Sequence, residues 1–260
     1  MIAKQDKPIY KRLFQEIFSE SPSFCDRIFN HRLDTVFDIR EGDRIQSFLY
    51  AIPFFAKVEG EVFRAVYVYG VGTVKEARGK GYMKEVFKKM EAFYGDSIDF
   101  YYLVPASESL FSLYETIGYK TGFYLKKELL FPKKCELPYE ISPAPDAFHS
   151  DYLRYLDRFP TAVYRSQADN DFYLGEGTYY KIRQSGFFIE KDKDTAMIRE
   201  AFIEDEKDLE CFLDFLYQKG FSKAILTLPE KKTPYAMVKT VSPRLQSVDF
   251  SEGYTNLNFD

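Results

Sequence analysis

The feature that most limits how this chain can fold is a glycine-containing turn between a predicted strand and a predicted amphipathic helix. The strand ends near Thr73. The turn then consists of Arg78, Gly79, Lys80, Gly81, Tyr82 and Met83. Glycine lets a backbone approach a ligand closely, and the first amides of a helix have no acceptor inside it. The helix dipole and two cationic side chains add positive potential, so this segment predicts a pyrophosphate site.

The residues around this turn predict a mixed α+β domain. Apolar stripes at helical spacing predict helices over residues 8–19 and 23–31. Alternating and apolar runs bounded by turn residues predict strands. These strands cover residues 36–40, 46–55, 62–73, 100–104 and 119–130, with the first three forming an antiparallel meander.

Two helices complete this first domain. The helix after the glycine turn places Met83, Val86, Phe87, Met90 and Phe93 on one face. A second, short helix follows the strand at 100–104. Ser107 is predicted to cap that helix and Gly118 to end it.

Four prolines within residues 131–145 predict a linker, and a weaker version of the same pattern follows it. Helices are predicted over residues 147–159 and 209–217. Strands are predicted at residues 187–190, 196–204, 224–228, 235–240 and 254–259. The predicted domains are therefore residues 1–130 and 146–260, joined by residues 131–145.

Other phosphate-binding turns fit the sequence less well. A P-loop needs Gly-x-x-x-x-Gly-Lys followed by Ser or Thr, which the residues around Gly81 do not provide. A dinucleotide-binding turn needs a third glycine where Lys84 stands, and it follows a parallel rather than an antiparallel start.

The strand, the turn and the helix together resemble motif A of the GNAT superfamily of acyl-CoA N-acyltransferases. The family pattern is Arg/Gln-x-x-Gly-x-Gly/Ala. Arg78 and Gly81 match it, whereas Met83 stands where glycine or alanine is usual. A second segment, 110–119, resembles the family's Leu-Tyr-Glu-Lys-Leu-Gly-Phe segment and places Tyr114 at the tyrosine that donates a proton to the departing thiolate. At an unperturbed pKa of about 10, Tyr114 suits that role.

The resemblance implies a donor, a site and a reaction. Acetyl-CoA would bind through its diphosphate at residues 78–83, and Val71, Gly72 and Thr73 would offer backbone groups to the pantetheine and the thioester. The acyl group would lie in a splayed gap between the strands at 62–73 and 100–104. It would pass directly to the primary amine of an unidentified small molecule or peptide, through positioning and charge stabilisation.

No general base is evident in the first half of the chain. His31 lies in an apparent connection between a helix and a strand, and Glu76 is a solvated loop charge beside the turn. A chain of water molecules can serve as the base in transferases of this kind.

The second half resembles a degenerate GNAT-like unit. Its equivalent strand-to-helix connection, residues 203–208, has four acidic groups and no glycine, so it would repel a diphosphate. Tandem arrangements of this sort resemble a clade that includes the aminoglycoside-acetylating enhanced-intracellular-survival proteins. We expect this half to lack acyl-CoA binding. Two roles stay open for it: walling off the acceptor cleft, or simple structural support.

Net charge, cysteine spacing and hydropathy argue against nucleic acid, metal ions and membranes as partners. The net charge of −4, without a basic face, argues against nucleic acid. Cys25, Cys135 and Cys211 share no metal-ligand spacing, so no metal is expected. No run approaches the roughly 18 apolar residues of a membrane span, and the start has no apolar signal core, which predicts a cytoplasmic protein away from membranes.

Two other functions remain open at this level. One is a non-catalytic acyl-CoA-binding or regulatory module, which thioester turnover with a panel of amines would distinguish. The other is a tRNA-dependent aminoacyl transferase, which a tRNA filter-binding test would distinguish. The oligomeric state is left open.

Overall fold

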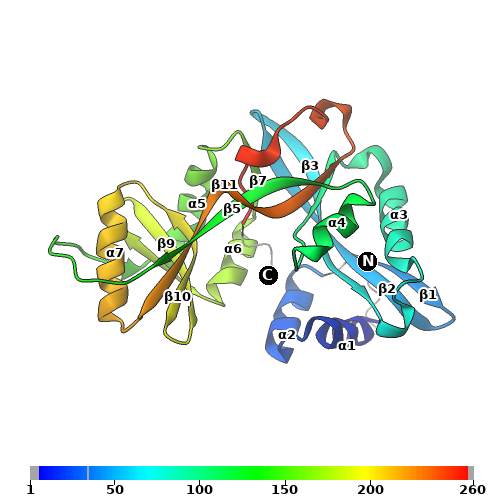
Figure 1. Cartoon of the computed structure of the whole chain (residues 1–260), viewed down its shortest axis with the longest axis horizontal. Helices are drawn as coiled ribbons and strands as arrows, with labels where there is room; N and C mark the ends of the chain where they lie inside the picture. Colours follow the sequence, from blue (N-terminus) through cyan, green and yellow to red (C-terminus); the bar gives the residue numbers. More distant parts are fainter. Residues whose placement is uncertain (1–5, 34, 257–260) are drawn as a thin grey trace. The chain divides into compact units, whose positions relative to one another are not determined.

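The computed structural model describes residues 6–33 and 35–256, and these form two compact units (Figure 1). The first unit comprises the chain up to Ala56 together with Val62–Lys120 and Ala236–Val248. The second comprises Lys57–Glu61, Thr121–Tyr235 and the chain from Asp249 onward. Each unit therefore takes in segments from both sides of residues 131–145.

The first unit confirms most of the predicted elements. Its helices are α1 (Lys7–Phe18), α2 (Pro22–His31), α3 (Tyr82–Tyr94) and α4 (Ser109–Glu115). Its strands are β1 (Val36–Glu41), β2 (Arg44–Val58), β3 (Glu61–Thr73) and β4 (Phe100–Leu103), and β5 (Lys120–Leu130) begins at its edge. Boundaries shift by one to three residues from the sequence-based ranges because helix and strand ends depend on local hydrogen bonds.

The sheet of the first unit is mixed, as the α+β prediction requires. Its strand order is β1-β2-β3-β4-β11. Strands β1 and β2 are antiparallel, β3 and β4 are parallel, and β4 and β11 are antiparallel. The helix α3 connects the parallel pair, since parallel neighbours need a crossover connection.

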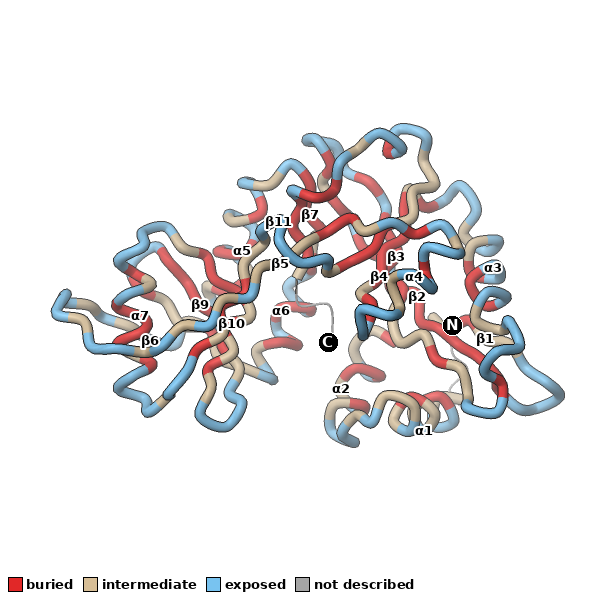
Figure 2. Tube along the Cα trace, in the orientation of Figure 1, coloured by how far each residue is buried: buried red, intermediate tan, exposed pale blue. Residues whose placement is uncertain are grey.

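Both faces of this sheet are covered. Side chains alternate along a strand, so Val66 and Val68 of β3 point to one face and Tyr67 and Tyr69 to the other. The valines join the apolar cluster that contains Phe87 of α3. The opposite face packs against α1, where the ring of Phe14 lies 5.8 Å from that of Tyr69. Figure 2 shows buried residues along these central strands and exposed residues in the turns around them.

Two details of the first unit differ from the sequence prediction. Phe93 is 69% exposed, although it was predicted on the buried face of α3. Tyr94 packs against the core instead, because the 83-86-87-90 stripe continues at position 94 in a 3.6-residue period. Ser107 does not cap α4 with its side chain; its hydroxyl bonds that of Ser109 at 3.0 Å.

The second unit has more structure than its sequence predicted. Its helices are α5 (Phe148–Leu156), α6 (Gln167–Leu174) and α7 (Glu206–Gln218). Its strands are β6 (Ser142–Pro143), β7 (Thr161–Tyr164), β8 (Thr178–Ile182), β9 (Ser185–Asp192) and β10 (Thr195–Phe202). The elements β7, α6 and β8 were not predicted, since each is short and has little periodicity.

The second unit repeats the element order of the first. Strands β8, β9 and β10 form an antiparallel meander, and α7 then leads to β11 (Lys223–Thr240), which pairs parallel with β10. This order matches that of β1, β2, β3, α3 and β4. The separate strands predicted at 224–228 and 235–240 are wrong, because β11 is continuous and its prolines, Pro229 and Pro234, lie in its less buried middle.

The predicted strand at 254–259 is also not formed over residues 254–256, which the structure describes. Tyr254 makes only an isolated bridge to Ala162, and residues 257–259 lie outside the described residues. No helix in the described ranges is long and apolar enough to cross a membrane.

A substitution at Gly70, inside β3, tests how tightly this strand packs against α1. Gly70 has φ +56°, and a Cβ there would lie 2.8 Å from the buried ring of Phe14. We expect Gly70→Ala to lower the free energy of unfolding by about 2–4 kcal/mol, from backbone strain and overpacking together. Urea unfolding measures this change.

Gly42 is the matched control. Its φ is +57°, but a Cβ there would meet nothing within 4 Å. Gly42→Ala should therefore cost only about 1 kcal/mol. Equal losses for the two variants would contradict the packing described around Gly70.

Candidate active site

The end of β3 is held by a buried hydroxyl group. Ser47 of β2 is fully buried and donates a hydrogen bond to the carbonyl oxygen of Gly72 at 3.0 Å. The same hydroxyl lies 3.0 Å from that of Thr73. The amide of Val74 donates to the carbonyl of Gln46 at 3.0 Å. Because these contacts are buried or in the backbone, they fix where the strand stops and the turn begins.

Past Tyr67, β3 is not paired with β4. The parallel ladder joins Ala65 to Phe100 and ends at Tyr67 and Tyr102. β3 continues to Thr73, whereas β4 ends at Leu103. The predicted donor residues Val71, Gly72 and Thr73 therefore lie beyond the last residue pair that joins β3 to β4.

The turn folds onto itself before the helix begins. Residues Lys75–Ala77 form one turn of 3-10 helix, and Ala77 is buried. The guanidinium Nε of Arg78 donates to the carbonyl of Thr73 at 3.4 Å, which ties the turn back to the strand. The amide of Lys80 makes a long, 3.4 Å bond to the carbonyl of Ala77, so this predicted ligand amide is already partly used.

The start of α3 leaves several amides without acceptors. Gly79 and Gly81 have φ +80° and +89°, conformations that favour glycine, and Gly81 is the N-cap of α3. Lys84 and Glu85 both donate to the carbonyl of Gly81. Among the described residues, no acceptor is found for four backbone amides. These are the amides of Gly79, Gly81, Tyr82 and Met83.

The charged groups around these amides are mostly exposed. Arg78 and Lys80 are exposed, and the Nζ of Lys80 lies 6.0 Å from the centre of the Tyr82 ring. The Tyr82 hydroxyl donates to a carboxylate oxygen of Glu41, and this bond raises the pKa of Tyr82. Sequence reasoning found neither Glu41 nor Ser47. The only indication for Ser47 was a small polar residue inside an apolar strand.

Tyr114 belongs to the same core as α3. It is 6% exposed, and its ring centre lies 6.0 Å from that of Phe87 of α3 and 6.2 Å from that of Tyr119. Burial raises the pKa of Tyr114 to about 12, so the unperturbed value of about 10 assumed from sequence is wrong. Within the described ranges the Tyr114 hydroxyl has no hydrogen-bond partner. Unlike the hydroxyl oxygens of Tyr50 and Tyr119, that of Tyr114 is not fully buried.

The other candidate groups are not joined to this tyrosine. His31 is the last residue of α2, and Glu76 is exposed in the 3-10 turn. No hydrogen bond of the described residues connects either side chain with Tyr114. In the part of the chain that the structure describes, no group of three or more His, Cys, Asp or Glu side chains could hold a metal ion.

The first turn of α7, the second unit's counterpart, is built differently. Its N-cap is Asp205, whose carboxylate accepts from the amide of Lys207 at 2.9 Å. The buried carboxylate of Asp208 pairs with Arg183 and accepts from Ser185 at 2.7 Å. Aspartate oxygens therefore occupy the positive end of this helix, where α3 has open glycines.

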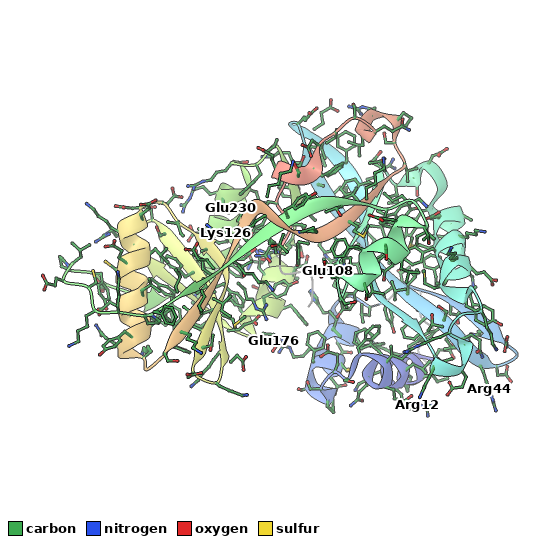
Figure 3. The ribbon with its side chains drawn as sticks, in the orientation of Figure 1. Arg12, Arg44, Glu108, Lys126, Glu176 and Glu230 are labelled. Carbon is green, nitrogen blue, oxygen red and sulfur yellow. The ribbon has the colours of Figure 1, made fainter. Side chains whose placement is uncertain are left out.

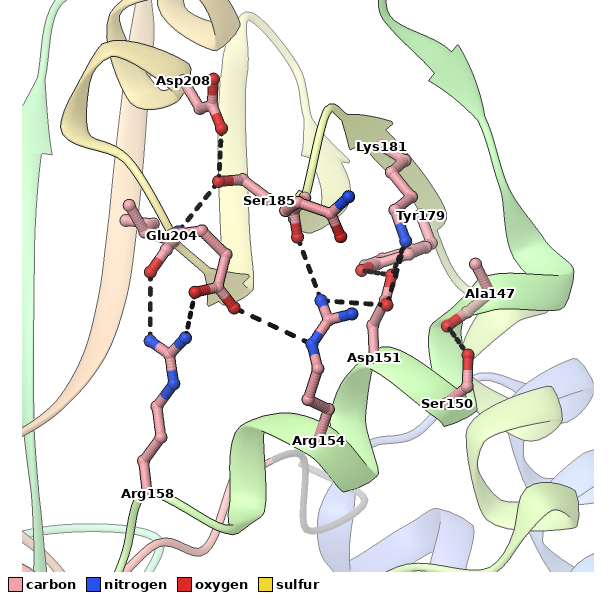
Figure 4. A network of polar contacts seen from close by, with 12 residues as sticks. Ala147, Ser150, Asp151, Arg154, Arg158, Tyr179, Lys181, Ser185, Glu204 and Asp208 are labelled. Carbon is pink, nitrogen blue, oxygen red and sulfur yellow. Dashed lines mark hydrogen bonds and ion pairs between the residues drawn. The ribbon is translucent and has the colours of Figure 1, made fainter.

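A wider ion network surrounds this helix start (Figure 4). Glu204 pairs with Arg158, and its amide donates to Ser185 at 2.9 Å. On α5, the buried carboxylate of Asp151 accepts from the Nζ of Lys181 at 2.9 Å. Buried charges are tolerated when paired in this way, so we interpret the network as structural.

Comparison with known families identifies the first half of the chain. A family model described as an acetyltransferase (GNAT) domain matches residues 2–122. Residues 2–122 are a GNAT acetyltransferase domain. This match spans just under half of the chain and contains both the turn at residues 78–83 and Tyr114.

Solved structures share the fold over almost the whole chain. A probable N-acyltransferase from Enterococcus faecalis V583 is 15% identical, with a TM-score of 0.78 over 92% of this chain and 71% of that one. A GCN5-related N-acetyltransferase from Anabaena variabilis is 16% identical, with a TM-score of 0.74 over 91% and 70%. Eis1 from Mycobacterium abscessus is 9% identical, with a TM-score of 0.68 over 92% and 72%. A search of curated protein sequences found no match.

The contact of Ser47 with β3 can be tested by removing one oxygen atom. Ser47→Ala leaves the buried carbonyl of Gly72 without this donor, so we expect the free energy of unfolding to fall by about 1–3 kcal/mol. Urea denaturation measures the change.

Ser112→Ala is the control for this experiment. Its hydroxyl also donates to a backbone carbonyl, that of Ser109 at 3.2 Å, but on the surface, where water replaces it. A loss below about 0.5 kcal/mol is expected there. If Ser47→Ala were as mild as Ser112→Ala, the hydroxyl would not hold the end of β3.

Proposed function

We propose that this protein transfers the acetyl group of acetyl-CoA directly to a primary amine of a small molecule or peptide. The observation that carries the proposal is the row of amides at Gly79, Gly81, Tyr82 and Met83, which have no acceptor among the described residues. They lie at the positive end of α3, directly after β3 and within a GNAT acetyltransferase domain.

The diphosphate of the donor suits this segment physically. Each unpaired amide supplies a hydrogen-bond donor, the helix dipole favours negative charge, and Arg78 and Lys80 can approach the phosphates from solvent. Met83, which departs from the family pattern, keeps its amide available, because among the described residues no acceptor is found for it.

The thioester end of the donor would lie along β3. Beyond Tyr67 the edge of β3 toward β4 is not paired, so alternate residues up to Thr73 can present amides and carbonyls there. In the reaction the amine nitrogen attacks the thioester carbon and gives up one proton to water, the C–S bond breaks, and the thiolate takes a proton. Tyr114 would donate that proton, directly or through water, and recover one from solvent.

The remaining elements of the proposal come from the sequence. The second unit would have lost acyl-CoA binding, because Asp205 and Asp208 occupy the first turn of α7, and would support the acceptor side. The net charge of −4 favours an acceptor that is not a nucleic acid. A cytoplasmic location away from membranes, with no metal requirement, stays a prediction.

Titration calorimetry with acetyl-CoA tests the binding part. We expect Arg78→Ala to weaken acetyl-CoA binding by about 10-fold or more, because the variant lacks the guanidinium and its charge-assisted hydrogen bond to phosphate. Arg12→Ala is the matched control: Arg12 is an exposed arginine of α1 (Figure 3), and among the described residues its one ion pair is with Glu16 of the same helix. Absence of heat with the unmodified protein would remove the proposal.

Tyr114→Phe tests the catalytic part. We expect kcat to fall by about 100-fold with little change in KM, since only proton donation is lost. Since burial raises the pKa of Tyr114 to about 12, the unmodified enzyme should show no loss of kcat from this group up to about pH 11. Steady-state release of CoA thiol across pH measures both.

The neighbouring Tyr119→Phe variant is the control, because its fully buried hydroxyl has no proposed role and no hydrogen-bond partner in the part of the chain that the structure describes. Its kcat should stay within about 2-fold of the unmodified enzyme. A Tyr114→Phe enzyme with equally unchanged kcat would exclude Tyr114 as the proton donor.

A further inference from the structure

Two of the three cysteines lie against each other in the second unit. Cys211 is in the middle of α7 and is fully buried in the apolar cluster of that unit. Cys135 is half-buried in the segment between β5 and β6 and packs on the same cluster. Cys135 is near enough to Cys211 to raise the pKa of its thiol, and both cysteines are free in the structure.

A separate polar network holds this pair in place. Asp214 lies about one turn along α7 from Cys211, and one of its carboxylate oxygens accepts from the amide of Cys135 at 3.2 Å. Its other oxygen accepts from the Tyr139 hydroxyl and, at 2.7 Å, from Gln218. The segment is thus anchored to α7 without any covalent bond, beside the helix turn that carries Cys211.

The two thiols differ in access. Cys211 is fully buried in the core, and burial, followed by the nearby Cys135 thiol, raises the pKa of its thiol. Cys135 is the half-buried member, and the amide of Leu137 donates to its sulfur at 3.4 Å. Because it is the more accessible of the two, Cys135 is the sulfur that an oxidant meets first.

We propose that Cys135 and Cys211 are a reversible disulfide site that closes when the protein meets a low-molecular-weight disulfide such as oxidised glutathione. The Cys135 thiolate attacks one sulfur of the oxidant, forms a mixed disulfide and expels one glutathione thiolate. Cys211 loses its proton and attacks the Cys135 sulfur, which expels the second glutathione. The two protein thiols are oxidised and the oxidant is reduced to two thiols.

Closure would tie the segment carrying Cys135 covalently to α7. The loop between the two cysteines is long, and a cross-link across a long loop restricts the unfolded chain strongly. The oxidised protein should therefore resist thermal unfolding better than the reduced protein. This inference does not depend on the proposed acyl transfer, because the pair lies in the second unit and the donor residues lie in the first.

The test uses the full chain, reduced, desalted and then incubated with oxidised glutathione. Thiol titration in denaturant should count three thiols before oxidation and one after it, since the chain has three cysteines. Peptide mapping without reductant should find Cys135 linked to Cys211, and Tm should rise by several degrees and return on reduction.

Variants separate this pair from the third cysteine. Cys25→Ala should behave like the unmodified protein, losing both remaining thiols, because Cys25 lies in α2 of the first unit. Cys135→Ser should form no intramolecular disulfide. Cys211→Ala should stop at the mixed disulfide of Cys135 with glutathione, which needs only partial access and no resolving thiol.

Several results would overturn the inference. These are a Cys25→Ala protein that keeps both thiols, a disulfide that joins two chains, and a link that includes Cys25. If Cys211→Ala fails to fold because its site is in the core, Cys135→Ser and Cys25→Ala still decide between these outcomes.

Discussion

The candidate site depends on where β3 stops. Ser47, buried in β2, holds the carbonyl of Gly72 and contacts the hydroxyl of Thr73, so the last residues of the strand cannot move independently of the sheet. The guanidinium of Arg78 then ties the turn back to Thr73. Because the open amides of α3 follow within a few residues, their position relative to β3 is set by the same contacts.

One apolar core connects the cofactor end of the site with the proposed proton donor. Phe87, on the buried face of α3, contacts the ring of Tyr114 on α4, and both side chains belong to the cluster beneath β3 and β4. The helix whose first turn would bind the diphosphate therefore also positions the tyrosine. The same burial raises the pKa of Tyr114, which keeps it protonated at neutral pH but makes it a weaker acid than a solvent-exposed tyrosine.

The two units show how the same order of elements can support or exclude anion binding. Each has an antiparallel meander, a helix and a parallel strand. In the first, glycine at positive φ starts the helix and leaves amides open. In the second, Asp205 caps the helix and Asp208 is buried beside it, so carboxylates occupy the place an anion would take. The difference lies in a few side chains.

The turn at residues 78–81 and the helix that follows it could be predicted from sequence alone. The glycines at 79 and 81, the cations at 78 and 80 and the helical stripe after them act over a few residues, so their pattern predicted the turn and the start of α3. Periodicity likewise predicted the helices and strands of the first unit. It failed for β7, α6 and β8, which are short, and for β11, which was predicted as two strands but is continuous.

Only the tertiary structure decided which distant residues act together. Several contacts join residues that are far apart in sequence: Ser47 with Gly72, Glu41 with Tyr82, and Cys135 with Cys211. The burial of Tyr114 likewise depends on packing between distant elements. The assignment of Ala236–Val248 to the first unit is of the same kind. Such contacts depend on how strands and helices pack, and local propensity contains no information about that packing.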